Sequence, residues 1–163
     1  MVTKRQFREE GHRRSFLAIV DDTPECARAV VYAARRAAAI GNGLVLAYII
    51  PPADFQHWLG VEERMREEAT EKATAELERF AELARDTCGC TVRTVIREGK
   101  PFEAVVKLIE EDRDIAIMVL AAGDSNEGPG PLVSSVAGRN ATFPIPVTVV
   151  PATLTDAEID DLV

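Results

Sequence analysis

The chain has 163 residues, of which 47% are hydrophobic and 28% are charged, and its formal net charge is −8. This length suits a single domain with a sizeable core, and the acidic balance disfavours nucleic acid and anionic membranes, which are bound mainly through Lys and Arg. The longest apolar run, residues 115–122, is too short to cross a bilayer, and residues 1–14 carry no secretory signal. We therefore expect a cytoplasmic protein.

The sequence alternates between strand and helix patterns from residue 15 to residue 151. Strands are expected at residues 16–20, 44–50, 91–97, 115–122 and 147–150. Helices are expected at about residues 24–40, 61–87 and 101–111, with a short helix within residues 132–143. Because strands that alternate with helices are joined by crossovers, this order predicts an α/β fold: a three-layer α/β/α, doubly wound sheet of five parallel strands. Residues 1–14 are expected to be a polar extension, residues 15–151 the domain itself, and residues 152–163 an acidic tail.

Two of the expected helices carry clear local signals. The first has Asp22 or Thr23 as its expected N-cap. On the second, an apolar stripe that includes Met65 is expected to face inward. The opposite face carries pairs such as Glu68 and Lys72, and we interpret it as a solvated surface rather than a site.

The three cysteines are too few for a disulfide framework and suit a reducing compartment. Cys88 and Cys90 flank a glycine, and such a pair could bind a metal or respond to redox conditions. A zinc site needs about four ligands, and the chain has only two histidines. We therefore interpret Cys88 and Cys90 as two free thiols near a turn.

Several motifs of catalysis are absent from the sequence. It contains no G-x-x-x-x-G-K-[ST], no G-x-G-x-x-G after the first strand, no G-x-S-x-G and no H-E-x-x-H. Asp21, Asp22 and Asp124 follow strands, where paired carboxylates could bind Mg²⁺ or act as acid and base. Because no His, Cys or Lys accompanies them, we favour structural roles for all three. No catalytic or metal-binding residue is assigned, and an enzyme is not expected.

A glycine-rich loop follows the expected strand at residues 115–122. Ligands of open α/β sheets bind at the carboxyl ends of strands, so residues 123–135 are expected to form half of any small-molecule site. Phe55, His57 and Trp58 precede the second helix and could stack on a base. We favour the alternative, in which this aromatic cluster covers the end of the sheet.

Three stretches together resemble the universal stress protein family. They are A-I-V-D-D-T-P-E at residues 18–25, E-G-K-P-F-E-A-V-V-K-L-I-E-E-D-R-D-I-A-I-M-V-L-A-A-G at residues 98–123, and F-P-I-P-V-T-V-V-P at residues 143–151. The resemblance covers residues 15–151. It implies an adenine nucleotide alpha hydrolase-like fold with strand order 3-2-1-4-5 and a role in stress response or signalling. It also implies a homodimer through the last strand, at Val147, Thr148, Val149 and Val150, and a site for ATP or AMP.

In nucleotide-binding members of that family the phosphate loop reads G-x2-G-x9-G-[ST], and its glycines let backbone amides approach the phosphates. In this sequence Asn126 stands at the second glycine, and Ser134 or, with strict spacing, Val136 stands at the third. The resemblance implies the following candidate nucleotide-binding residues: Val20, Asp21, Ile49 and Ala122 around the adenine and ribose, and Gly123, Asn126, Ser134, Ser135 and Val136 along the loop.

The loop departs from the family pattern in its charge. Asp124 and Glu127 are acidic, residues 123–135 contain no Lys or Arg, and Pro129 and Pro131 lack a backbone N–H. We infer that triphosphate binding is impaired, whereas an adenosine-like or AMP-sized ligand could still be held by the ends of the first two strands.

The leading expectation is a non-enzymatic, homodimeric stress-response or signalling protein with a degenerate adenine-nucleotide site and an unknown protein partner. One alternative is an ATP- or AMP-binding switch with slow hydrolysis through Asp21 and Mg²⁺, the metal being expected only with a bound nucleotide. The other is an enzyme that uses paired carboxylates on a different small ligand.

Overall fold

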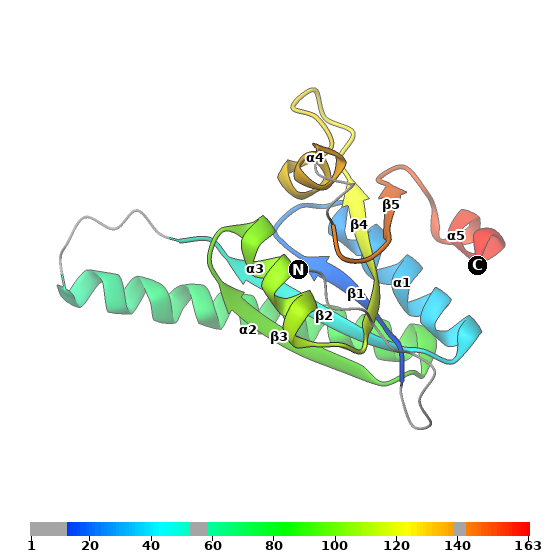
Figure 1. The fold of residues 1–163 in the computed structure, drawn as a ribbon, viewed down its shortest axis with the longest axis horizontal. Coiled ribbons are helices and arrows are strands. Elements are labelled where there is room, and N and C mark those ends of the chain that lie inside the picture. The colour runs from blue at the N-terminus through cyan, green and yellow to red at the C-terminus, as the bar shows by residue number, and fades with distance from the viewer. Residues whose placement is uncertain (1–12, 53–58, 139–142) are drawn as a thin grey trace.

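The computed structural model describes residues 13–52, 59–138 and 143–163, and it consists of one parallel sheet covered by helices on both faces (Figure 1). The strands are β1 (Ser15–Val20), β2 (Gly43–Ile50), β3 (Val92–Glu98), β4 (Ile115–Ala122) and β5 (Val147–Pro151). The helices are α1 (Cys26–Ile40), α2 (Leu59–Cys88), α3 (Pro101–Glu111), α4 (Pro131–Gly138) and α5 (Asp156–Leu162). The strand order is β3-β2-β1-β4-β5, and every pairing is parallel. The predicted fold class and strand order are therefore confirmed.

The central strand β1 has one core on each of its faces. Phe16, Ala18 and Val20 pack into the core that α1 and α2 cover, whereas Leu17 and Ile19 pack into the core that α3 and α4 cover. Successive side chains of a strand point to opposite faces, so a strand buried on both faces reads as an unbroken apolar run. This is why the apolar pattern alone placed β1 at the centre.

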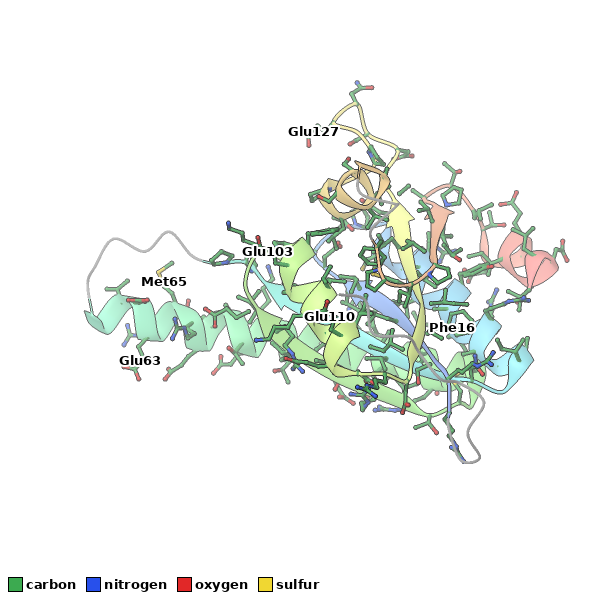
Figure 2. All side chains as sticks on the ribbon, viewed as in Figure 1. Phe16, Glu63, Met65, Glu103, Glu110 and Glu127 are labelled. Carbon is green, nitrogen blue, oxygen red and sulfur yellow. A yellow bond between two sulfur atoms is a disulfide. The ribbon has the colours of Figure 1, made fainter. Side chains whose placement is uncertain are left out.

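Helix α2 is longer than the sheet that it covers. Thirty residues of helix span about 45 Å, whereas the seven residues of β3 span about 23 Å. The amino-terminal half of α2 therefore extends past the sheet (Figures 1 and 2). Met65 is 42% exposed and Val61 is 56% exposed, so the prediction that this part of the stripe faces inward is wrong.

The start of α1 differs from the prediction. The N-cap is Glu25, whose side chain makes no capping hydrogen bond, and the helix begins at Cys26 rather than before it. The Asp21 carboxylate instead accepts a hydrogen bond from the Thr23 backbone N–H at 2.8 Å, which holds the preceding residues in a turn. Asp22 and Thr23 are therefore not the N-cap, because that turn delays the helix.

Cys88 and Cys90 form a disulfide, so the interpretation of these two residues as free thiols is wrong. Cys88 is the last residue of α2, and Gly89 adopts a positive φ of 59°, which lets the chain reverse between the two sulfurs. This disulfide lies at the amino-terminal edge of the sheet, beside the start of β3. Among the cysteines, Cys26 is free and buried.

The acidic tail docks on the domain. Helix α5 begins with a capping box in which Thr155 is the N-cap and Glu158 is its partner. Arg28 and Arg35 of α1 form ion pairs with Asp156 at 2.6 Å and with Asp160 at 2.7 Å. Ile159 is fully buried. Within the described ranges, no helix has the length and apolar character that crossing a membrane requires.

Candidate functional site

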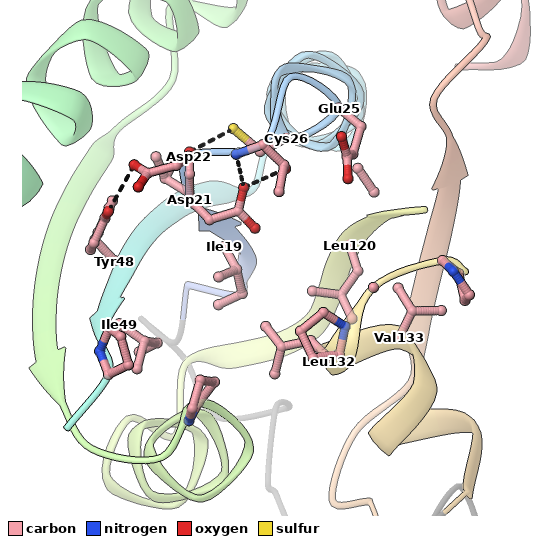
Figure 3. Close-up of a pocket in the computed structure, with 18 residues that line it drawn as sticks. Ile19, Asp21, Asp22, Glu25, Cys26, Tyr48, Ile49, Leu120, Leu132 and Val133 are labelled. Carbon is pink, nitrogen blue, oxygen red and sulfur yellow. Dashed lines mark hydrogen bonds between the residues drawn. The ribbon is translucent and has the colours of Figure 1, made fainter. Parts of the chain in front are cut away.

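A pocket with a volume of about 340 Å³ opens at the carboxyl ends of β1, β2 and β4 (Figure 3). The chain leaves β1 toward β2 on one side of the sheet, and β4 lies on the other side of β1. In doubly wound sheets such a switch point is the usual place for a ligand. The fold therefore places the pocket where the sequence predicted a site.

One part of the pocket is apolar. Ile19, Ile49 and Leu120 extend into it from three neighbouring strands, and Leu132 and Val133 close it from α4 (Figure 3). Most of these side chains belong to the core between the sheet and helices α3 and α4. Their positions are set by sheet register and core packing, so this wall is rigid. A flat heteroaromatic ring of modest size suits such a wall.

The rim beside β2 is polar and internally bonded. The Tyr48 hydroxyl donates to Asp22 Oδ1 at 3.0 Å, and Lys72 Nζ donates to Asp22 Oδ2 at 2.7 Å. The hydrogen bond from Lys72 lowers the pKa of Asp22, with a smaller contribution from Tyr48. Burial, and then the hydrogen bond to Asp22, raise the pKa of Tyr48 to about 12. Helix α2 is thus tied to the loop after β1.

Lys72 is a residue that the sequence reading missed. We assigned it to a solvated face of α2, but the structure places its ammonium on Asp22 at the rim of the pocket. The contact joins residues 50 positions apart, so helical spacing contains no signal for it. This contact could have been found only by knowing that α2 lies beside the loop after β1.

Asp21 is also bonded to its neighbours in the turn. Its carboxylate accepts hydrogen bonds from the backbone N–H and the hydroxyl of Thr23. Its carbonyl oxygen accepts one from the Cys26 thiol at 3.4 Å. Burial raises the pKa of Cys26 to about 11, so this cysteine stays a neutral thiol at physiological pH and is a poor nucleophile.

The loop between β4 and α4 uses its own amides. The Gly123 N–H donates to the Pro129 carbonyl at 3.1 Å, and the Gly128 N–H donates to the Ser125 carbonyl at 3.1 Å. The Ser134 N–H donates to the Gly130 carbonyl at 3.0 Å. Gly128 and Gly130 have positive φ values of 97° and 110°, which the turn requires. At these three amides the loop is thus folded on itself.

Glu25 is a second residue that sequence reasoning missed. It lines the pocket, and a Cβ atom at position 123 would lie 2.9 Å from Glu25 Oε1. The carboxylate therefore occupies the space directly beside Gly123. In Figure 3, Glu25 lies between α1 and the end of β4. Its place at a helix start was visible in the sequence, but its approach to a glycine far along the chain was not.

The structure brings together only some of the predicted nucleotide-binding residues. Val20, Asp21 and Ile49 line the pocket, together with Ala121 rather than Ala122. Five loop positions lie outside the lining: Gly123, Asn126, Ser134, Ser135 and Val136. Asn126 and Ser134 are exposed, Gly123 and Ser135 are half-buried, and Val136 is in the core.

The two carboxylates that the alternative of an enzyme would pair are not both in the pocket. Asp21 lines it, whereas Asp124 is exposed and outside the lining. No group of three or more His, Cys, Asp or Glu that could hold a metal ion occurs in the ranges that the structure describes. The aromatic cluster at Phe55, His57 and Trp58 lies outside the described residues, as do residues 1–12 of the polar extension.

The strand order and the pocket at the switch point define an α/β protein of the adenine nucleotide alpha hydrolase-like class. The model of the Universal stress protein family matches residues 12–151, and the chain belongs to this family. No curated protein matches the chain.

Solved structures of universal stress proteins share the fold. The protein UspA from Lactobacillus plantarum superposes with a TM-score of 0.73 at 18% identity, over 86% of this chain and 99% of that one. A universal stress protein in complex with cAMP gives 0.65 at 19% identity, over 88% and 100%. The Archaeoglobus fulgidus protein in complex with dAMP gives 0.59 at 17% identity, over 84% and 96%. At these identities the likeness concerns the fold alone.

Proposed function

We propose that this chain is a non-enzymatic, cytoplasmic stress-response or signalling protein, and that its pocket holds an adenosine-sized ligand. The observation that carries this proposal is the contrast within the pocket between an apolar wall built on three strands and a loop in which three backbone amides are bonded internally. Family membership supports the stress-response role. Relatives of the same fold in complex with cAMP and dAMP support an adenine ligand.

The bonding of the polar groups supports a binding role rather than catalysis. General acid–base catalysis needs a group whose protons are free to move at the operating pH. Asp22 is fixed by Tyr48 and Lys72, and Asp21 is occupied by Thr23. The thiol of Cys26 is buried and neutral. Asp22 and Cys26, whose pKa values are lowered and raised respectively, are therefore not poised for proton transfer near neutral pH.

We also propose that the protein forms a homodimer through β5. This strand lies at one end of the sheet order and pairs with β4 on its inner side. Val149 on it is 43% exposed, although it is a large apolar side chain. Pairing of two β5 strands across a two-fold axis would cover this edge and its side chains.

The dimer is tested by placing a charge on that edge. Val149→Asp should give a monomer or an insoluble protein in light scattering, because the charge would be buried at the interface. Thr153→Asp, at an exposed residue just after β5, is the matched control and should leave the assembly unchanged. A soluble and still dimeric Val149→Asp protein would contradict the proposal.

The ligand is tested by filling the pocket. Val133 lines it from α4, and Ala137 is an exposed residue of the same helix. Val133→Trp should abolish adenosine binding in titration calorimetry, because the indole would occupy the apolar wall. Ala137→Trp should leave binding unchanged. Equal adenosine affinity in both variants would place the ligand elsewhere.

A further inference from the structure

We propose that Glu25 makes this pocket selective for uncharged nucleosides, because its carboxylate lines the end of the pocket beside β4. This inference rests on the proposed adenine site, and it concerns the end of that site that faces β4. It gives Glu25 a specificity-determining role, although Glu25 is not part of the glycine-rich loop after β4.

The position of the carboxylate carries the first step. Glu25 belongs to the turn before α1, is half-buried and lines the pocket. Its Oε1 atom is close enough to Gly123 that a Cβ atom there would lie 2.9 Å away. The nearest backbone oxygen to that same point is the Gly128 carbonyl, at 3.5 Å. The space beside Gly123 is thus bounded by a carboxylate and a carbonyl, which are both hydrogen-bond acceptors.

The charge of the pocket carries the second step. Asp21, Asp22 and Glu25 line it, and its lining includes no Lys or Arg in the ranges that the structure describes. Lys72 offsets the charge of Asp22, to which it is hydrogen-bonded at 2.7 Å. The carboxylates of Asp21 and Glu25 then remain in the lining without an ion pair. A phosphate brought into the same pocket is repelled by both.

The backbone of the loop carries the third step. Anion cradles work through free amides that point at the ligand. Here the N–H groups of Gly123, Gly128 and Ser134 donate to carbonyls of the loop itself. Pro129 and Pro131 line the pocket and have no N–H to offer. These three amides and two prolines therefore offer no free donor to a phosphate.

An uncharged nucleoside meets the same surface favourably. Its hydroxyl and amino groups are hydrogen-bond donors, and an ionised carboxylate is an acceptor that forms strong, charge-assisted hydrogen bonds. The base would lie on the apolar wall made by Ile19, Ile49 and Leu120. At its end of the pocket, Glu25 thus favours a hydroxyl group, which donates a hydrogen bond, over a phosphate, which only accepts one.

The test compares adenosine with AMP by titration calorimetry on the full chain. The wild-type protein should bind adenosine and bind AMP at least about 100-fold more weakly, as expected for like charges in an enclosed site. Glu25→Gln keeps the shape of the side chain and removes its charge, so it should narrow that ratio by about tenfold or more. Glu25→Ala should narrow it further, because it also opens the space.

Glu127→Gln is the matched control. Glu127 lies in the exposed part of the loop between β4 and α4, away from the sheet (Figure 2), and does not line the pocket. This variant removes the same charge and should leave the adenosine-to-AMP ratio unchanged. Circular dichroism checks that each variant is folded.

The outcomes separate this inference from the function on which it rests. Equal affinities of the wild-type protein for adenosine and AMP, or a ratio unchanged by Glu25→Gln, would overturn the role of Glu25 and leave the adenine site standing. Binding of neither ligand to any variant would overturn the adenine site and this inference together. AMP binding that appears only when Glu25 is replaced would support its role in exclusion.

Discussion

The two sides of the pocket are built differently. The side formed by β1 and β2 consists of strand ends fixed by parallel pairing, and it keeps three of the residues expected around a base: Val20, Asp21 and Ile49. The side formed by the loop after β4 differs, because three of its backbone amides are bonded within the loop. A binding surface made of strand ends is constrained by the core, whereas a loop can lose one binding function without disturbing the fold.

The largest expected difference between the two sides is in stability. Ile19→Ala removes a buried side chain that also lines the pocket, and it should lower the free energy of unfolding by about 2–5 kcal/mol. Asn126→Ala changes an exposed residue of the loop and should shift it by less than about 0.5 kcal/mol. Urea unfolding of both variants measures this. Comparable losses would show that the loop is as tightly constrained as the strands.

Removal of the disulfide should change the free energy of unfolding less than Ile19→Ala does. Cys88 and Cys90 are separated by two positions, so their bond closes a very short loop and constrains the unfolded chain little. Cys90→Ser should lower the free energy of unfolding by less than about 2 kcal/mol. The disulfide lies at the edge of the sheet opposite the pocket, so adenosine affinity should stay unchanged in the same variant. A loss of binding would mean that the two ends of the sheet are coupled.

The bonded rim predicts a change of stability at alkaline pH. The pKa of Tyr48 is raised to about 12, above the value of about 10 for an unfolded tyrosine. The folded state therefore favours the neutral phenol. The stability that this provides is fully present below pH 10 and is lost as the pH rises toward 12.

Tyr48→Phe tests that window. The variant has no phenol at this position, so its unfolding free energy should fall less than that of the wild-type protein between pH 10 and 12. Tyr32 remains as an internal reference in absorbance titrations. Identical alkaline profiles of the two proteins would contradict the bonded rim.

A small effect is also expected at Gly123. Its φ is not among the positive values, so an alanine suits the backbone; the added Cβ comes too close only to the flexible end of Glu25 and makes an ordinary contact with the Gly128 carbonyl at 3.5 Å. Gly123→Ala should cost less than about 1 kcal/mol. In a Glu25→Ala background, Gly123→Ala should no longer lower the free energy of unfolding. A double-mutant cycle measured by urea unfolding would show this. Additive effects would mean that the two residues do not meet.

The sequence was sufficient for the fold because the determining signals are local. Apolar runs buried on both faces mark β1, β2 and β4, and glycine and proline punctuate the connections. The length of α2 was predicted to within a few residues, but the exposure of Met65 was not, since an apolar stripe does not show where the sheet beneath it ends.

The candidate site was only partly predictable for a related reason. Asp21 and Ile49 were expected at strand ends, and both line the pocket. Lys72 on Asp22 and Glu25 beside Gly123 are contacts between distant segments, and neither has a periodicity that a single sequence could reveal. The internal hydrogen bonds of the loop depend on backbone geometry, which its glycine and proline content only suggested.

Native mass spectrometry of the full chain, mixed with equal concentrations of adenosine and ATP, tests most directly whether one side of the pocket is retained and the other lost. The predicted result is a species that carries adenosine and no detectable ATP complex, with the adenosine complex lost in Val133→Trp. A spectrum dominated by the ATP complex would contradict this account, because it would require a loop that is open to phosphates.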